Sequence, residues 1–295
     1  MKISKIQLGT VQFGLNYGIA NTGGKPAYEK ARDIVRAAFE GGINCFDTAA
    51  IYGDSEEVLG RIIEELKLSG KVHIISKVPP VSERKFAGRE AADFIRESVK
   101  TSLRRLRLDY LSVVLFHREE DVKYLPVLRQ LEAQGLIENC GVSLDTVQYC
   151  DEVLTQKAKF VQLPYNILDK RFDRFLPEAE KQNINIFTRS LYLQGLLLMS
   201  EENIAETLRK IIPARRTLAR LAADAGMAMP ELCVRFVLSN PAITSILTGV
   251  DNAEQLEKNL QLFKKGPLPP ALYQAVKAAV PPLEEKLIRP CLWKI

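Results

Sequence analysis

The chain has 295 residues, of which 46% are hydrophobic and 26% are charged, and this balance excludes a disordered or fibrous protein. The 41 basic and 36 acidic residues leave a net charge of +5 without a long run of like charges, so nucleic-acid binding is not indicated. The first residues lack the apolar core of a signal peptide, and no stretch reaches the roughly 18 apolar residues of a membrane span. We therefore expect a cytoplasmic protein that binds neither membranes nor nucleic acid.

The numbers of histidines and cysteines restrict metal chemistry. The chain has two histidines, His73 and His117, and five cysteines that lie far apart without CxxC spacing. A zinc site built from His and Cys needs closely spaced ligands, and a disulfide-rich secreted domain needs a regular cysteine framework. The sequence therefore predicts neither, and we expect no metal.

Short β-type runs rich in Val, Ile, Leu and Phe alternate with longer stretches along the whole chain. Such apolar runs are typical of strands that are buried on both faces of a parallel sheet. The predicted strands cover residues 6–11, 44–48, 72–78, 110–117, 137–144, 160–165, 184–190 and 243–250.

The stretches between these runs carry apolar residues at helical spacing, and Gly41, Gly70, Gly135 and Gly226 stand where helices are expected to end. The predicted helices cover residues 28–39, 56–66, 90–106, 122–134, 147–155, 171–181, 215–225 and 253–263, with an extra helix at 230–238 and a tail helix at 270–287.

Eight strands that each precede a helix predict an α/β protein with a (β/α)8 TIM barrel, an extra helix before strand eight and a C-terminal helical tail. Length alone allows two domains, but nothing resembling an interdomain linker interrupts the alternation, so we expect a single domain over residues 1–295. The alternative is an open doubly wound sheet. It is disfavoured because no GxGxxG motif follows the first strand.

Polar side chains end three consecutive predicted strands, where active sites of such barrels lie. Asp47, Lys77 and His117 end strands two, three and four, and Tyr52 follows Asp47. Each has an ordinary structural interpretation when taken alone, but together they indicate proton transfer to a carbonyl oxygen. A lysine can lower the high pKa of a tyrosine, an aspartate can hold that lysine, and a histidine can bind the substrate oxygen. None of them can supply a hydride, so a nicotinamide cofactor is expected.

The segment GGINCFDTAAIYGDSEEVLG, residues 41–60, resembles the aldo-keto reductase family, including the separation of five residues between Asp47 and Tyr52. The resemblance continues in family order over nearly the whole chain. It includes SKV at Lys77, LFH at His117, GVS at Ser143, VQLPYN around Gln162, RSLYLQGLL at Gly195 and ILTGVDNAEQLEKNL near the carboxyl end.

The resemblance implies NAD(P)H-dependent reduction of an aldehyde or ketone without a metal. Tyr52 would act as general acid, Lys77 and Asp47 would tune its pKa, and His117 would orient the carbonyl. Other residues would bind the nicotinamide carboxamide, the pyrophosphate and the adenosine. The cofactor contacts it implies are Gly9, Thr10, Ser143, Gln162, Arg189, Ser190, Gly195, Leu196, Gly249, Gln255 and Asn259.

Three positions depart from the family pattern. Leu144 replaces an asparagine, Arg189 replaces the aromatic residue that stacks on the nicotinamide, and no clear basic residue is available for an adenosine 2′-phosphate near Asp251 and Glu254. NADP(H) is the family default, while the two carboxylates make NAD(H) plausible. Polar and cationic residues in the loops after strands one and four favour a sugar-like or anionic carbonyl as the small-molecule substrate.

Two other functions stay open at this point, as does the oligomeric state. The first is a cofactor-binding accessory or redox-sensor protein with little turnover, although all four candidate catalytic residues are present. The second is a lyase in which Lys77 forms a Schiff base. A neighbouring Asp47 argues against the lyase, because it would stabilise the charged form of the lysine.

Overall fold

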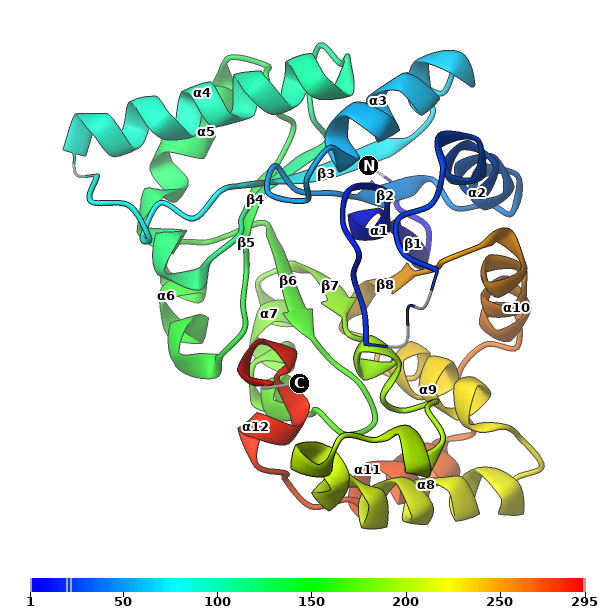
Figure 1. Ribbon diagram of the computed structural model, residues 1–295. Helices are drawn as coiled ribbons and strands as arrows, with labels where there is room; N and C mark the ends of the chain where they lie inside the picture. Colours follow the sequence, from blue (N-terminus) through cyan, green and yellow to red (C-terminus); the bar gives the residue numbers. More distant parts are fainter. Residues whose placement is uncertain (1, 20, 22, 87, 294–295) are drawn as a thin grey trace.

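The computed structural model describes residues 2–19, 21, 23–86 and 88–293. Over these residues, eight parallel strands form a closed barrel in which each strand pairs with the next along the chain, and β8 closes the barrel against β1 (Figure 1). The strands are β1 (Ile6–Gly9), β2 (Cys45–Asp47), β3 (His73–Val78), β4 (Val113–Phe116), β5 (Cys140–Ser143), β6 (Phe160–Pro164), β7 (Asn185–Arg189) and β8 (Ile243–Gly249).

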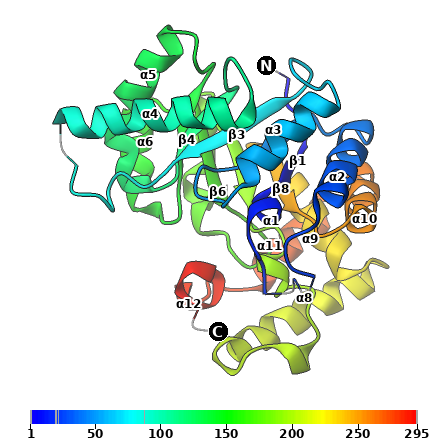
Figure 2. The same ribbon diagram turned by 45° about the horizontal axis from the view of Figure 1, so that its top comes forward.

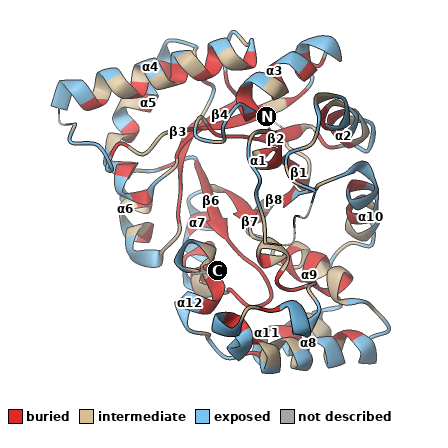
Figure 3. Ribbon diagram, viewed as in Figure 1, coloured by how far each residue is buried: buried red, intermediate tan, exposed pale blue. Residues whose placement is uncertain are grey.

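Helices surround the barrel, and Figure 3 shows that the strands are buried while the outer faces of the helices are exposed. In the described part of the chain, the helices are α1 (Val11–Gly14), α2 (Tyr28–Glu40), α3 (Ser55–Glu65), α4 (Gly88–Leu106), α5 (Leu125–Ala133), α6 (Cys150–Thr155), α7 (Leu176–Lys181), α8 (Ile212–Asp224), α9 (Met229–Leu238), α10 (Ala253–Lys264), α11 (Pro270–Ala279) and α12 (Glu285–Ile288).

The predicted (β/α)8 barrel is confirmed, including the extra helix α9 before β8. The predicted strands at 110–117 and 137–144 are too long, because only their last parts enter the barrel as β4 and β5. Their first parts meet in one isolated bridge between Leu111 and Ile137. Val11 was also expected in the first strand, but it begins α1.

The carboxyl-terminal tail is helical, as expected, but it is not the single helix predicted over 270–287. It consists of α11 and α12, and Pro281 and Pro282 lie between them. A proline cannot donate a helical hydrogen bond, and its ring clashes with the preceding turn, so the helix is interrupted there. α2 ends at Glu40 with Gly41 as its cap, as expected, and the next residue, Gly42, adopts the left-handed conformation with φ +90°.

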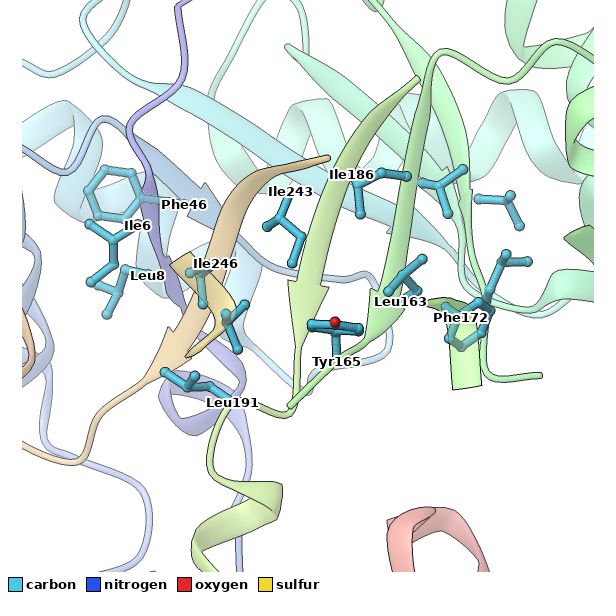
Figure 4. Packing of buried hydrophobic residues seen from close by; sticks show 14 of the residues in the cluster. Ile6, Leu8, Phe46, Leu163, Tyr165, Phe172, Ile186, Leu191, Ile243 and Ile246 are labelled. Atoms are coloured by element: carbon cyan, nitrogen blue, oxygen red, sulfur yellow. The ribbon is translucent and has the colours of Figure 1, made fainter. Parts of the chain in front are cut away.

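Two apolar cores flank the barrel wall. The larger one lies between the strands and the surrounding helices, and Figure 4 shows Leu8, Phe46, Leu163 and Ile246 in it. We call this larger cluster the outer core. The smaller cluster, the inner core, fills the inside of the barrel, because inward-facing side chains alternate with outward-facing ones along each strand. Its members are Cys45, Ile75, Val113, Leu115, Phe160 and Phe187. Over the described residues, no helix is both long and apolar enough to cross a membrane.

Candidate active site

The inner core predicts which side chains point into the carboxyl end of the barrel. Because side chains alternate along a strand, a residue two positions after an inward-facing one also faces inward. Cys45, Ile75, Leu115, Phe160 and Phe187 belong to the inner core. The residues two positions further on are Asp47, Lys77, His117, Gln162 and Arg189. Side chains from β2, β3, β4, β6 and β7 are thus brought to one end of the barrel, whereas His73 begins β3 at the opposite end.

A buried ion pair lies at the centre of this group. Lys77 Nζ donates to Asp47 Oδ1 at 2.6 Å and to the carbonyl of Thr48 at 2.9 Å, and the side chains of Lys77 and Asp47 are 1% and 2% exposed. Burial lowers the pKa of Lys77, and the Asp47 carboxylate opposes that change. The sequence-based expectation that Asp47 contacts the lysine is therefore met in the structure.

Gln162 makes a contact that the sequence did not indicate. Its Nε2 atom donates to Asp47 Oδ2 at 2.8 Å, so both oxygens of the carboxylate are engaged by fixed donors. Gln162 also lines the cleft beside the barrel mouth. The same side chain thereby connects the cleft to the buried Lys77–Asp47 pair.

Tyr52 lies directly over this pair. Its ring centroid is 5.2 Å from Lys77 Nζ and 5.7 Å from the ring of His117, which it meets edge to face. Burial, and after it the Asp47 charge, raises the pKa of Tyr52, and the Arg189 charge opposes this rise. We expected Lys77 to lower this pKa, but in the structure burial dominates and the Asp47 charge raises the pKa further. Tyr52 is therefore a protonated phenol, able to donate.

The loop that carries Tyr52 is fixed by a close backbone contact with the segment after β1. A Cβ atom added to Gly14 would come 1.8 Å from the carbonyl oxygen of Tyr52, and one added to Gly53, which has φ +55°, would come 2.4 Å from the carbonyl oxygen of Gly14. Only glycine fits at either position. The packing of these two glycines therefore sets the height of Tyr52 above the barrel.

His117 is a neutral imidazole in this environment. Burial, together with the charges of Lys77 and Arg189, lowers the pKa of His117 to about 3. Its Nδ1 atom is buried and has no hydrogen-bond partner among the described residues. A neutral ring beside the Tyr52 phenol can hold one hydrogen bond to a substrate oxygen without adding a charge.

A cleft of about 1100 Å³ runs from Tyr52 across the carboxyl ends of β7, β8 and β1. Asp47 and Tyr52 line one end of it, whereas Lys77 and His117 are not among its lining residues. Most of the implied cofactor contacts do line it, namely Gly9, Thr10, Gln162, Arg189, Ser190, Gly195, Gly249, Gln255 and Asn259.

Two implied cofactor contacts lie outside the cleft wall. Ser143 ends β5, pairs in register with Gln162 and is buried, and Leu196 is wholly buried in the outer core. Several lining residues were not predicted from the sequence, among them Gln12, Tyr192, Glu231 and Lys265. Gln12 directly follows the first predicted strand and Tyr192 lies two residues after the seventh, which was a usable signal. Glu231 and Lys265 come from α9 and from the end of α10, and only the tertiary fold brings them together.

One wall of the cleft joins two loops that are distant in sequence. Gln194 Nε2 donates to the Tyr17 hydroxyl at 3.2 Å. Figures 1 and 2 show the loop between α1 and α2 reaching the segment after β7, where these residues lie. Ser190 and Gln194 adopt the left-handed conformation, with φ of 64° and 54°. Non-glycine residues adopt this conformation in only a few per cent of cases, and here it shapes the turn that follows β7.

Polar atoms in the cleft fit a dinucleotide. Gln12 Oε1 and Asp251 Oδ1 line the cleft, are buried and have no partner among the described residues, so each is an acceptor ready for a hydroxyl or amino group. A Cβ atom at Gly249 would come 2.8 Å from Gln12 Nε2, so a side chain there would displace Gln12. Gly249 thus leaves room for Gln12, and Gln12 and Asp251 provide hydrogen-bond acceptors in the cleft.

Arg189 is held in the cleft by a carboxylate that the carboxyl-terminal tail shares. Its Nη2 atom donates to Asp145 Oδ1 at 2.8 Å and to the Leu144 carbonyl at 3.1 Å. Asp145 Oδ2 accepts from Nη2 and Nε of Arg289 at 2.6 and 2.9 Å. Although burial opposes the effect, the two guanidinium groups hold the pKa of Asp145 well below its usual range. The tail is thereby joined to the residue that positions Arg189.

A barrel with this carboxyl-end cluster and cleft defines a class of protein, and residues 5–281 match the aldo/keto reductase family. The chain therefore belongs to this family, and it is an NAD(P)H-dependent oxidoreductase. No metal-binding group of three or more His, Cys, Asp or Glu side chains occurs among the described residues.

Two relatives and one solved structure illustrate the similarity. L-galactose dehydrogenase of Arabidopsis thaliana is 26% identical over 88% of this chain and 84% of its own length. The NADH-specific methylglyoxal reductase of Escherichia coli is 26% identical over 88% of this chain and 93% of its own length. The aldo-keto reductase AKR11C1 from Bacillus halodurans, solved in its holo form, superimposes with a TM-score of 0.79 at 20% identity, covering 95% of this chain and 93% of that one.

Proposed function

We propose that this oxidoreductase reduces an aldehyde or ketone to an alcohol, with Tyr52 as the proton donor. The arrangement of Tyr52 carries the proposal: a protonated phenol lies at the cleft end, above the buried Lys77–Asp47 pair and against a neutral His117. A nicotinamide dinucleotide bound in the cleft would supply the hydride for the carbonyl carbon.

The side chains have separate tasks in this mechanism. Tyr52 transfers its proton to the carbonyl oxygen as negative charge develops there, and His117 donates a hydrogen bond to the same oxygen. Lys77 stabilises the phenolate that remains on Tyr52, which is worth most in a buried site. Asp47 keeps Lys77 in place, and Gln162 fixes the second oxygen of that carboxylate. In the reverse direction, Tyr52 accepts the proton of the alcohol.

The test is turnover of reduced nicotinamide cofactor with a panel of aldehydes, keto sugars and sugar phosphates. Tyr52→Phe keeps the ring and removes the proton, so we expect kcat to fall by at least ~100-fold. Tyr110→Phe is the matched control, because Tyr110 is exposed and precedes β4 at the opposite end of the barrel. Full activity of Tyr52→Phe on the best substrate would overturn the proposed mechanism. Tight cofactor binding without turnover of any substrate would instead favour the accessory or sensor function.

For the cofactor, we propose that NAD(H) is used alongside the family default NADP(H). Two lysines line the cleft away from Tyr52, and both are already paired: Lys265 with Glu231 at 2.6 Å and Lys258 with Glu254 at 2.7 Å. The unpartnered Asp251 Oδ1 can accept a bond from a ribose hydroxyl and repels a phosphate. The NADH-specific reductase among the relatives supports this choice. A Kd for NADPH more than a hundredfold below that for NADH would contradict it.

For the substrate, we propose a sugar-like carbonyl compound. The charged loop after β4 gives little support for an anionic substrate, because Arg118 pairs with Glu83 and Glu119 accepts from the backbone of Asp145 and Thr146. The loop charges therefore stabilise the loops themselves. The dehydrogenase of a sugar among the relatives supports the sugar-like alternative. The substrate panel separates the two, since sugar phosphates and neutral keto sugars are measured side by side.

A further inference from the structure

Arg189 is a fixed cation at the catalytic end of the cleft. It ends β7, lines the cleft together with Tyr52 and Gln162, and its side chain is 26% exposed. One edge of its guanidinium is fastened by Asp145 and by the Leu144 carbonyl, both through Nη2. Fastening through a single nitrogen fixes the position of the group and leaves its other nitrogens free of hydrogen bonds to described residues.

The charge of Arg189 is only partly neutralised by its partner. Asp145 makes one hydrogen bond to Arg189 and two to Arg289, so Arg189 shares its carboxylate partner, while Arg289 also pairs with Glu285 at 2.6 Å. The remaining positive charge reaches the catalytic residues. It contributes to the lowered pKa values of His117 and Lys77 after burial, and it opposes the raised pKa of Tyr52.

We propose that Arg189 makes the cleft bind the reduced nicotinamide cofactor more tightly than the oxidised one. The oxidised ring carries a positive charge and the reduced ring is neutral, so a fixed cation beside the ring repels only the oxidised form. This inference rests on the proposed function, because hydride transfer to a carbonyl beside Tyr52 requires the ring to lie at the end of the cleft that Arg189 lines. A neutral aromatic residue at this position would stack on either form without this discrimination.

The consequence for the enzyme is that the reduced cofactor, which starts the reaction, is held more tightly than the oxidised cofactor, which ends it. Arg189 promotes release of the oxidised cofactor after reduction and weakens inhibition by that product. At an effective dielectric constant of ~40 and a separation on the order of 7 Å, the repulsion between two unit charges corresponds to roughly a tenfold difference in Kd.

The test measures Kd for the oxidised and the reduced cofactor by titration calorimetry, without substrate, on the full chain. We expect the ratio of the oxidised to the reduced Kd to fall roughly tenfold in Arg189→Gln. Arg189→Tyr keeps a planar stacking group and removes the charge, so it should lower the ratio equally. Asp145→Asn keeps a hydrogen-bond acceptor and removes the counter-charge, so the ratio should rise.

Arg118→Gln is the matched control, because it removes the same charge from an exposed side chain that pairs with Glu83 outside the cleft. Its ratio should change less than twofold, since solvent screens it. A ratio that is unchanged in Arg189→Tyr, or lowered as strongly in Arg118→Gln, would show that the charge of Arg189 does not discriminate. If neither cofactor form binds the wild-type protein, the proposed function itself fails, whereas two bound forms with an insensitive ratio overturn only this inference.

Discussion

At the level of single residues, the buried Lys77–Asp47 pair links stability to catalysis. Two charges that are almost wholly removed from water are tolerated only because each satisfies the other, with Thr48 and Gln162 completing the hydrogen bonds. Asp47→Asn should therefore destabilise the fold by about 3–5 kcal/mol, because it leaves the lysine charge uncompensated. Urea unfolding measures this loss.

The double variant Asp47→Asn with Lys77→Met is the control for that prediction. Removing both charges should restore much of the stability without restoring carbonyl reduction, since the phenolate of Tyr52 then lacks its cation. A single variant that is as stable as the wild-type protein would contradict the view that the pair is the main charge compensation in the barrel interior.

His117 gives the folded state a defined dependence on pH. Its pKa is lowered to about 3 in the folded protein, from an ordinary value near 6.5. Between those values the unfolded chain binds a proton that the folded chain does not, so the free energy of unfolding decreases as pH falls from ~6.5 towards ~3. His117→Gln should lose part of this slope in denaturant titrations at several pH values. His73→Gln should change it less, because His73 is only partly buried and its pKa is less strongly lowered.

Residue spacing explains which of these contacts could be predicted from the sequence. Asp47 and Lys77 end adjacent strands with the same inward parity, so their contact follows from the strand assignment. The bond between Gln162 and Asp47 crosses the barrel interior, and the Asp145–Arg289 pair joins residues that are far apart in the chain. The Asp145–Arg289 pair depends on the conformations of a loop and of the tail, which strand periodicity does not encode.

At the level of elements, the loops are positioned by close backbone contacts. Gly14→Ala would place a Cβ atom 1.8 Å from the Tyr52 carbonyl oxygen, so the loop that carries Tyr52 must move. We expect kcat to fall at least ~10-fold, because a displacement of about 1 Å in a catalytic group is costly. Gly23→Ala is the control, since its added Cβ would lie no closer than 3.9 Å to Asn21 Oδ1. Unchanged kinetics in Gly14→Ala would show that the loop height does not matter.

The elements also show the limit of periodicity as a guide. All eight strands could be located because apolar runs of this composition recur between helical stretches. Eight successive units of one strand and one helix then predict a closed barrel. The break between α11 and α12 was signalled by Pro281 and Pro282, but the helical spacing around them concealed it. The beginnings of β4 and β5 were predicted too early, because the preceding residues are extended but pair only once, through Leu111 and Ile137, outside the barrel.

At the level of the whole molecule, the single-domain expectation for residues 1–295 becomes a prediction about cooperativity. Several contacts in the described structure fasten the carboxyl-terminal tail to the rest of the molecule, and two groups of them are short. Lys170 Nζ donates to the carbonyls of Lys277 and Val280 at 2.6 and 2.9 Å, and Arg289 pairs with Asp145 at 2.6 Å. Since these contacts reach across the molecule and β8 closes on β1, the tail and the barrel should unfold together.

Trp293 allows a direct measurement of this coupling, because it is the one tryptophan of the sequence and lies in the tail. Its fluorescence reports on the tail, while far-UV circular dichroism reports mainly on the barrel and its helices. In urea the two transitions should coincide for the wild-type protein. Arg289→Gln removes the charge that holds the tail to Asp145, so the fluorescence transition should then precede the dichroism transition. Separate transitions in the wild-type protein would mean that the tail is an independent unit, and that Arg189 is positioned without it.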